Sequence, residues 1–323
     1  MPSRTVFLLG AGFVGGSVLQ ALLEDGSYAI SVLNRDPEKA DKLKELGVRP
    51  VEGSLHDDEV TSREAAQADI VLHIATADDL PSVQSILKGL EQRDQSKPPA
   101  IYIHTSGTGV FMRPLHPEHV VFSDKDPAQW DELVPGDAPH RQIDLTIKRA
   151  AESGKLNAKI SIMLPPLIYG TGNGPFNQHS IQIPRWIAQS VKNKQVTIAG
   201  PTLTWNSIHV LDLVPAYLTA LSYLSSLPSS ARPPIYLVPS TGEHTWRSLG
   251  QRLDAELKKR GLIDPAAEVK EQDEPDWTTL TGTRSRARGE WLSEWGWKRD
   301  ESLPDVHGSV AEEIDHIKAT GQI

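Results

Sequence analysis

The chain has no cysteine among its 323 residues, which excludes a disulfide framework and a thiolate nucleophile. It also has no basic run, and its net charge is −9, so a nucleic-acid partner is not expected. No apolar stretch is long enough to span a membrane, and the N-terminus enters an apolar strand without room for a signal peptide. These absences predict a soluble, cytoplasmic protein with no membrane partner.

A glycine turn at the N-terminus organises the rest of the chain. The apolar run 6–9 ends at Gly10, and Gly12 and Gly15 complete the spacing G-x-G-x-x-G before an amphipathic helix. The first glycine allows a tight turn, the second lets the backbone approach a pyrophosphate, and the third lets the helix pack against the strand. The helix N-terminus, with Phe13 and Val14, is expected to contact the same phosphates.

The end of the second strand indicates which dinucleotide binds. Arg35 follows the apolar run 29–33 at the position where an arginine suits a 2′-phosphate and an acid suits a free ribose. Asp36 precedes Pro37, so we interpret Asp36 as a helix N-cap and Arg35 as the phosphate contact. The predicted cofactor is therefore NADP, with NAD as the alternative. Arg35 can also be read as a solvated loop cation.

Strands and helices then alternate, which predicts an α/β fold with a doubly wound parallel (Rossmann) sheet. Ligands in such sheets bind beyond the carboxyl ends of the strands. The residues expected to contact the cofactor there are Ser54, Leu55, Ala75, Thr76, Ala77, Thr105, Pro165, Pro166 and Leu167. We assign residues 1–170, with a returning segment at about 205–240, to the dinucleotide-binding domain. Residues 171–204 and 241–323 are assigned to a smaller substrate lobe.

With these segments in place, the chain resembles the extended short-chain dehydrogenase/reductase superfamily, of the epimerase/dehydratase type. The Gly10 turn resembles the cofactor turn of that family. Residues 53–57 resemble its G-D-L-x-D segment, with Ser54 in place of the acid. Residues 164–170 are similar to its R-P-x-x-x-Y-G stretch, with Leu164 in place of the arginine, and residues 209–212 to its H-V-x-D segment.

The catalytic motif of the family, Y-x-x-x-K, is only half matched. By spacing, Lys148 takes the lysine position and Asp144 takes that of the tyrosine. The resemblance implies that Lys148 holds the nicotinamide ribose and that a hydroxyl after the fifth strand assists catalysis. Ser106 and Thr108 are candidates for that hydroxyl, although spacing places the usual position on Gly107.

The chemistry of Asp144 depends on Lys148. An i,i+4 Asp–Lys pair keeps a carboxylate ionised, so we expect Asp144 to be a poor proton donor that mainly orders the ribose-binding lysine. Burial of Asp144 would reverse that expectation. Two interpretations therefore stay open: Asp144 takes part in catalysis, or the protein has no catalytic activity.

Other candidate groups are weaker. His116 and His119 flank a proline that breaks their alignment, so no metal site is predicted. We interpret His140 as a polar surface residue, although it lies one turn before Asp144, and Tyr169 as structural.

Three functions follow from this pattern. The first is an NADP-dependent oxidoreductase or isomerase that acts on a small organic molecule. The second is an NmrA-like NAD(P)-binding regulator without turnover, and the third is a non-redox isomerase or cyclase. The sequence does not name the substrate, and it is compatible with a homodimer.

Overall fold

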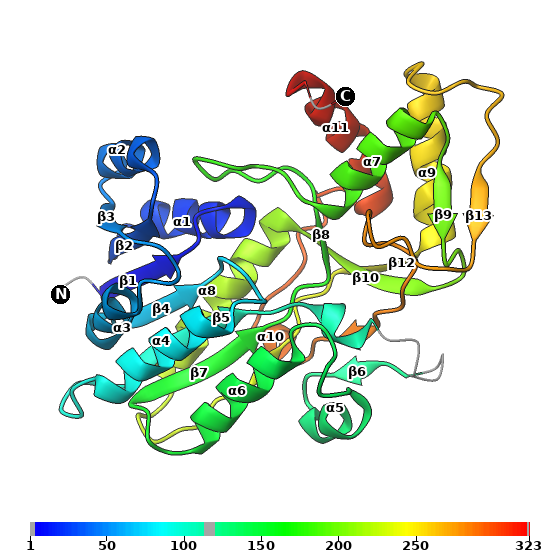
Figure 1. Ribbon diagram of the computed structural model, residues 1–323. Helices are drawn as coiled ribbons and strands as arrows, with labels where there is room; N and C mark the ends of the chain where they lie inside the picture. The colour runs from blue at the N-terminus through cyan, green and yellow to red at the C-terminus, as the bar shows by residue number, and fades with distance from the viewer. Residues whose placement is uncertain (1–3, 113–119, 322) are drawn as a thin grey trace.

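The computed structural model describes residues 4–112, 120–321 and 323, and a seven-stranded sheet forms its centre (Figure 1). The strand order is β3-β2-β1-β4-β5-β7-β11, and every neighbouring pair is parallel. The strands are β1 (Arg4–Leu9), β2 (Tyr28–Asn34), β3 (Arg49–Glu52), β4 (Ile70–His73), β5 (Ala100–Thr105), β7 (Ala158–Met163) and β11 (Tyr236–Leu237). The doubly wound α/β fold predicted from the sequence is confirmed.

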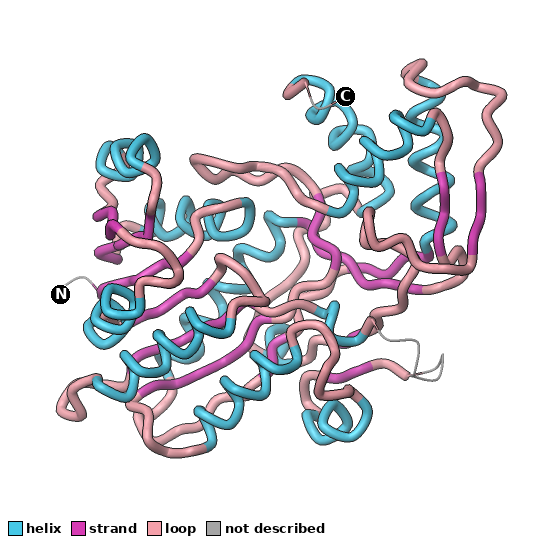
Figure 2. Tube along the Cα trace, viewed as in Figure 1, coloured by secondary structure: helices cyan, strands magenta, loops and turns pink. Residues whose placement is uncertain are grey.

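Helices cover both faces of this sheet because its strands are apolar on both sides. Val6 and Leu8 of β1 point into a core shared with α1 and α8, whereas Phe7 and Leu9 point into a core shared with α3, α4 and α6. Figure 2 shows the two helical layers with the strands between them. The helices are α1 (Phe13–Asp25), α2 (Pro37–Glu45), α3 (Asp58–Gln67), α4 (Leu80–Gln92), α6 (Arg141–Glu152) and α8 (Val210–Ser226).

The second lobe has its own core between small sheets and three helices. Its three-stranded sheet has the order β12-β10-β8, and β9 pairs with β13. The elements are β8 (Leu167–Tyr169), α7 (Gln182–Asn193), β9 (Thr197–Ala199), β10 (Thr204–His209), β12 (Gly242–Thr245), α9 (Trp246–Lys259), β13 (Lys270–Gln272) and α11 (Val306–Ala319). Strand β10 pairs with β8 and β12 within the second lobe. The chain then returns to the large sheet through α8, which packs on one face, and β11, which pairs with β7.

Short elements connect the two lobes. They are the 3₁₀ helix η1 (Thr108–Phe111), β6 (Phe122–Ser123), α5 (Pro127–Leu133), β14 (Ala287–Arg288) and α10 (Trp291–Glu294), and β6 pairs with β14. His116 and His119 lie outside the described residues.

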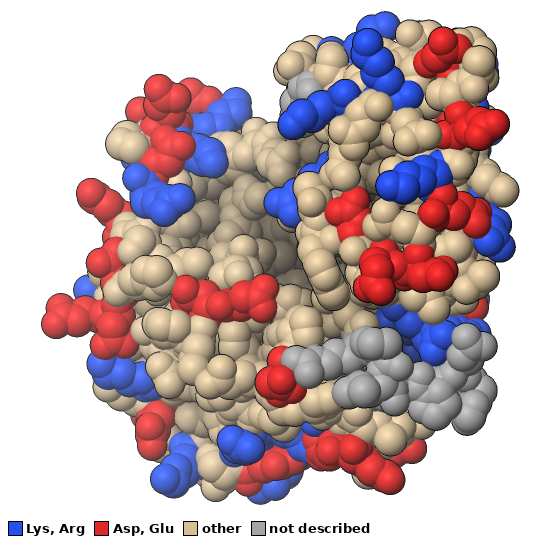
Figure 3. Space-filling view, turned by 45° about the vertical axis from the view of Figure 1, so that its right-hand side comes forward, with Lys and Arg blue, Asp and Glu red and all other residues tan. Residues whose placement is uncertain are grey.

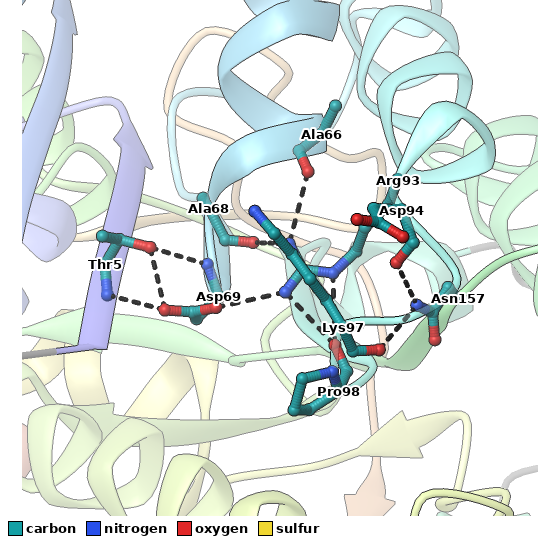
Figure 4. Close-up of polar contacts among 9 residues, drawn as sticks. All are labelled: Thr5, Ala66, Ala68, Asp69, Arg93, Asp94, Lys97, Pro98 and Asn157. Carbon is teal, nitrogen blue, oxygen red and sulfur yellow. Dashed lines mark hydrogen bonds and ion pairs between the residues drawn. The ribbon is translucent and has the colours of Figure 1, made fainter. Parts of the chain in front are cut away.

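A buried arginine joins elements at the amino-terminal edge of the sheet, opposite the ligand-binding edge (Figure 4). Arg93, only 2% exposed, donates hydrogen bonds to the carbonyl oxygens of Ala66, Ala68 and Pro98 and pairs with Asp69 at 3.1 Å. Asp69 in turn accepts hydrogen bonds from the backbone and hydroxyl of Thr5 on β1. A buried charge persists only when it is paired and hydrogen-bonded, and Arg93 meets both conditions.

Candidate functional site

The glycine turn after β1 has the geometry of a phosphate-binding turn. Gly10 has a φ of +97°, and a Cβ there would lie 2.4 Å from the Cα of Ala75. A Cβ on Gly15 would lie 1.8 Å from the carbonyl oxygen of Gly10, so the helix packs directly on the turn. Gly12 differs, because no heavy atom lies within 4 Å of a Cβ built there. The turn therefore leaves open space beside Gly12 at the N-terminus of α1.

That space belongs to a cavity of about 900 Å³ at the carboxyl ends of the strands. Figure 3 shows a hollow between the large sheet and the second lobe, with charged side chains on its rim. The predicted cofactor contacts that line the cavity are Gly10, Gly12, Phe13, Val14, Arg35, Ser54, Leu55, Ala75, Thr105 and Pro166. Its volume lies within the range of small-molecule and cofactor sites. These residues fit a dinucleotide whose pyrophosphate lies at Gly12.

Two cations face the cavity at the end of β2. Arg35 and Lys39 both line it, and neither forms an ion pair with another described residue. Asp36 is the N-cap of α2, as predicted, and its carboxylate accepts hydrogen bonds from the backbone of Glu38 and Lys39. The Asp36 carboxylate is thus occupied by the backbone of α2, whereas the Arg35 guanidinium is available to a ligand.

The outer wall of the cavity was not predicted from the sequence. Phe176, Asn177, Ser180, Ile181 and Gln182 line it from the segment that leads into the second lobe. Gly172 and Gly174 hold this segment on α1, since a Cβ on Gly174 would lie 2.4 Å from the backbone of Gly16. The glycines at 170, 172 and 174 were the signal that could have placed the segment against the cofactor turn.

Several predicted site residues do not line the cavity. Thr76 and Ala77 form the turn that follows Ala75, where the Thr76 hydroxyl accepts a hydrogen bond from the backbone of Asp78. Leu167 is buried in the core of the second lobe. Thr108 is fully buried in η1, and its backbone N–H donates to the Pro165 carbonyl oxygen at 3.0 Å.

Asp144 is a buried carboxyl group rather than an exposed one. It is 1% exposed, and its Oδ2 accepts a hydrogen bond from the Ser106 hydroxyl at 3.1 Å. Its Oδ1 has no hydrogen-bond partner among the described residues. Burial raises the pKa of Asp144 to about 7, against the smaller opposing effect of the Ser106 hydrogen bond. A carboxyl group in this state can carry a proton near neutral pH.

The predicted ion pair between Asp144 and Lys148 is wrong. Lys148 forms an ion pair with Asp131 of α5 and lies 4.0 Å from Glu152. It lines a separate depression of about 340 Å³, not the large cavity. The physical reason is that α5 packs beside α6 and offers Lys148 a carboxylate, while Asp144 faces the buried end of β5. The structure therefore gives no support to a ribose contact by Lys148.

His140 is not the surface residue that we expected. Its side chain is 19% exposed, and Nδ1 lies 2.6 Å from Oδ1 of Asp78, in the loop after β4. The hydrogen bond to His140 holds the pKa of Asp78 below its usual value. No signal in the sequence joins these residues, which are 62 positions apart.

Two other features bear on the class of site. Among the described side chains, no three His, Cys, Asp or Glu residues gather as a metal site would require. Within the same part of the chain, no helix has the length and apolar character needed to cross a bilayer. Tyr169, interpreted as structural, donates its hydroxyl proton to the Pro304 carbonyl oxygen in the second lobe.

Comparison with known proteins agrees with this geometry. The sequence profile of an NAD(P)H-binding family matches residues 10–104, which run from the glycine turn to β5. The chain is 25% identical over 282 residues to the oxidase ucsJ of Acremonium sp., with 81% of each chain covered. It is 33% identical over 88 residues, 26% of each chain, to a decarboxylating sterol-4-alpha-carboxylate 3-dehydrogenase of Dictyostelium discoideum. The N-terminal part of the chain is thus an NAD(P)H-binding domain.

Solved structures extend the likeness to the whole fold. The UDP-glucose 4-epimerase of Thermotoga maritima superposes with a TM-score of 0.68 at 15% identity, over 98% of this chain and 99% of the epimerase. The UDP-glucuronic acid 4-epimerase of Bacillus cereus, solved with NAD, gives a TM-score of 0.64 at 16% identity, over 98% and 96%. At these identities the likeness establishes the fold alone, which this chain shares with the two epimerases.

Proposed function

We propose that this protein is an NADP-dependent oxidoreductase of the extended short-chain type, acting on an alcohol or carbonyl group of a small organic molecule. The observation that carries the proposal is the open space at Gly12 inside a cavity that also contains Arg35 and Lys39. Pyrophosphate requires close approach of the backbone at the turn, and a 2′-phosphate requires a cation at the end of β2. Both requirements are met in one cavity.

The residues of the chain have distinct tasks in this function. The backbone at Gly12 and the N-terminus of α1 hold the pyrophosphate, and Arg35 pairs with the 2′-phosphate. Thr105, the last residue of β5, and Pro166 line the inner end of the cavity. When bound there, the nicotinamide supplies a hydride donor or acceptor. The second lobe closes over the substrate, and residues 176–182 exclude water from the cofactor.

The relatives favour redox chemistry without fixing the substrate. Those that cover most of the chain include an oxidase, and an NAD-bound epimerase shares the fold. Oxidation and epimerisation through a keto intermediate begin with the same step, removal of a hydride from a carbon that bears a hydroxyl group. We therefore assign that step to this protein and leave open whether the hydride returns to the same substrate.

A regulator that binds NAD(P) without turnover is the second candidate. The observation that favours it is the position of Lys148, which pairs with Asp131 outside the cavity and leaves the Y-x-x-x-K arrangement unfilled. The buried Asp144, whose carboxyl group can hold a proton near neutral pH, favours the enzyme instead.

The experiment that separates them has two stages. Binding of NADPH and NADH is measured first by nicotinamide fluorescence. A panel of secondary alcohols with NADP⁺, and of ketones and aldehydes with NADPH, is then followed at the nicotinamide absorbance. We expect tighter binding of NADPH than of NADH, and turnover in the panel. Absence of binding to either dinucleotide would contradict the proposal, whereas tight binding with no turnover would favour the regulator.

A further inference from the structure

An imidazole lies at the start of α6, close to the turn that follows β5. His140 is the N-cap of α6, but its side chain does not cap the helix; it pairs with Asp78. Its φ of 64° lies in the left-handed region, which is uncommon for residues other than glycine. Unusual backbone geometry of this kind concentrates at functional sites, where surrounding contacts maintain it. The contact with Asp78 directs the ring toward β5.

The other ring nitrogen faces the position that the resemblance assigns to a catalytic hydroxyl. A Cβ on Gly107 would lie 3.5 Å from Nε2 of His140, and a Cβ on Gly109 would lie 3.1 Å from it. A Cβ at position 107 would be in van der Waals contact with the imidazole, and one at position 109 would crowd it. Nε2 has no hydrogen-bond partner among the described residues, although Nδ1 is fully engaged.

This imidazole adjoins the inner end of the cofactor cavity. The Cβ position of Gly107 is 3.7 Å from the carbonyl oxygen of Pro165, and Pro166, the next residue, lines the cavity. Thr105, two residues before Gly107, lines it as well. His140 itself does not line the cavity, but it lies beside two segments that do, at Thr105 and at Pro166.

Other groups near this end are less suited to exchange a proton with a substrate. The Tyr217 hydroxyl is 2.6 Å from Oγ1 of Thr105, but the side chain is completely buried, and burial raises its pKa above the usual value for a tyrosine. Asp144 lies under Ser106 and is 1% exposed. Lys148 faces away from the cavity.

We propose that His140, oriented by Asp78, is the proton acceptor and donor for the substrate oxygen, in place of the tyrosine whose sequence position Asp144 takes. This inference rests on the proposed function. Asp78 accepts a hydrogen bond from Nδ1–H and so leaves a lone pair on Nε2. During oxidation, the O–H bond of the alcohol breaks and its proton moves to Nε2. The C–H bond breaks with its electron pair, which leaves as hydride to NADP⁺, and a C=O bond forms. Reduction runs the same steps in reverse.

The first test needs no substrate. Native protein is treated with diethyl pyrocarbonate, which acylates unprotonated imidazole nitrogens, and the modified histidines are located by peptide mass spectrometry. We expect His140 to react, saturating NADP⁺ to slow that reaction at least severalfold, and Asp78→Asn to slow it too. An amide at position 78 can donate to Nδ1, which moves the proton to Nε2. His307, which contacts Ser248 in the second lobe, is the internal control and should react alike in all samples.

The second test uses any alcohol or ketone that the wild type turns over. His140→Asn is chosen because asparagine tolerates the left-handed backbone. We expect it to lower kcat about 10²- to 10⁴-fold, the effect of a lost general acid–base group, with unchanged NADPH affinity. Asp78→Asn should lower kcat without raising KM, and His307→Asn should leave both unchanged.

The outcomes separate this inference from the proposed function. Failure of wild-type protein to bind NADPH would remove both. Binding and turnover that persist in His140→Asn would remove the role of His140 and leave the proposed function. His140 acylation that responds neither to NADP⁺ nor to Asp78→Asn would also overturn the inference, even where no substrate is turned over.

Discussion

Asp144 lies one turn before Lys148 on α6, yet its carboxylate accepts a hydrogen bond from Ser106 while Lys148 pairs with Asp131. The two side chains therefore have different electrostatic environments. Asp144 is isolated from compensating lysine charge, so burial dominates and raises its pKa to about 7. Because Lys148 does not pair with Asp144, we expect replacement of Asp144 to change how the stability of the protein depends on pH.

The first prediction concerns stability as a function of pH in Asp144→Asn. The pKa of Asp144 in the folded protein is raised to about 7, above the value of 3.8 expected when unfolded, so the folded state binds more protons between these pH values. The stabilisation that protonated Asp144 gives to the folded state is fully present below about pH 4 and is lost as the pH rises to about 7. We expect wild type to lose stability relative to Asp144→Asn over that range, by about 1.4 kcal/mol per unit of pKa difference. Urea unfolding of both proteins from pH 4 to 8 measures it.

Parallel stability curves for the two proteins would contradict this prediction. Glu313, whose pKa burial also raises to about 7, is present in both and cancels in the difference. Ser106→Ala is the matched control. It removes the hydrogen bond that stabilises the charged form, so it should raise the pKa of Asp144 further and extend the loss of stability to higher pH.

The second prediction contrasts two glycines of the cofactor turn. Gly12→Val places a side chain in open space, so it should abolish NADPH binding with a small change in melting temperature. Gly15→Val places a Cβ 1.8 Å from the Gly10 carbonyl oxygen, so it should destabilise the fold itself. Fluorescence titration and thermal unfolding of both variants test the contrast. Normal NADPH affinity in a folded Gly12→Val would exclude the turn as the pyrophosphate site.

The third prediction concerns the choice of dinucleotide. A charge-assisted hydrogen bond from Arg35 to the 2′-phosphate is worth roughly 1.5–3 kcal/mol, so Arg35→Ala should weaken NADPH binding about ten- to hundredfold. NADH lacks that phosphate and should bind nearly as before. Lys39→Ala should have a smaller effect in the same direction, since this side chain also lies over the Phe176 ring at 5.7 Å. Equal losses for both dinucleotides would show that Arg35 does not bind the phosphate.

The fourth prediction concerns the buried Arg93. Arg93→Met keeps most of the volume but leaves the carbonyl oxygens of Ala66, Ala68 and Pro98 without their donor. We expect a loss of about 2–4 kcal/mol in the free energy of unfolding, with NADPH affinity unchanged because the site lies at the opposite edge of the sheet. Arg93→Lys keeps the charge without the planar fork and should give an intermediate loss. If the free energy of unfolding of Arg93→Met were close to that of wild type, water would have to replace the guanidinium as the hydrogen-bond donor.

Local sequence pattern was enough to predict several of the residues that line the cavity. The glycine turn, the strand ends at Ser54, Ala75 and Thr105, and the cap at Asp36 each follow from a few neighbouring residues. The direction of Lys148 could not be predicted, because it depends on Asp131, which is 17 residues away on another helix. The contact between His140 and Asp78 likewise arises only when β4 and β5 lie side by side and α6 begins over their ends.

The fifth prediction concerns acid stability and a buried histidine pair in the central strands. The Nδ1 atoms of His73 on β4 and His104 on β5 lie 3.0 Å apart, and both side chains are completely buried. Burial lowers the pKa of His73 to about 4 and also lowers that of His104, whereas an unfolded histidine has a pKa near 6.5. Between these values the unfolded state binds more protons, so the free energy of unfolding decreases as the pH falls from about 6.5 toward 4. For His73 alone, the expected decrease in the free energy of unfolding is about 3 kcal/mol.

His73→Asn should be less stable than wild type at pH 8 because it loses packing, but its stability should fall less steeply below pH 6.5. Urea unfolding of both proteins, with His307→Asn as the control for a histidine outside this pair, measures the two slopes. Identical slopes in wild type and His73→Asn would mean that the pair already carries a proton in the folded state.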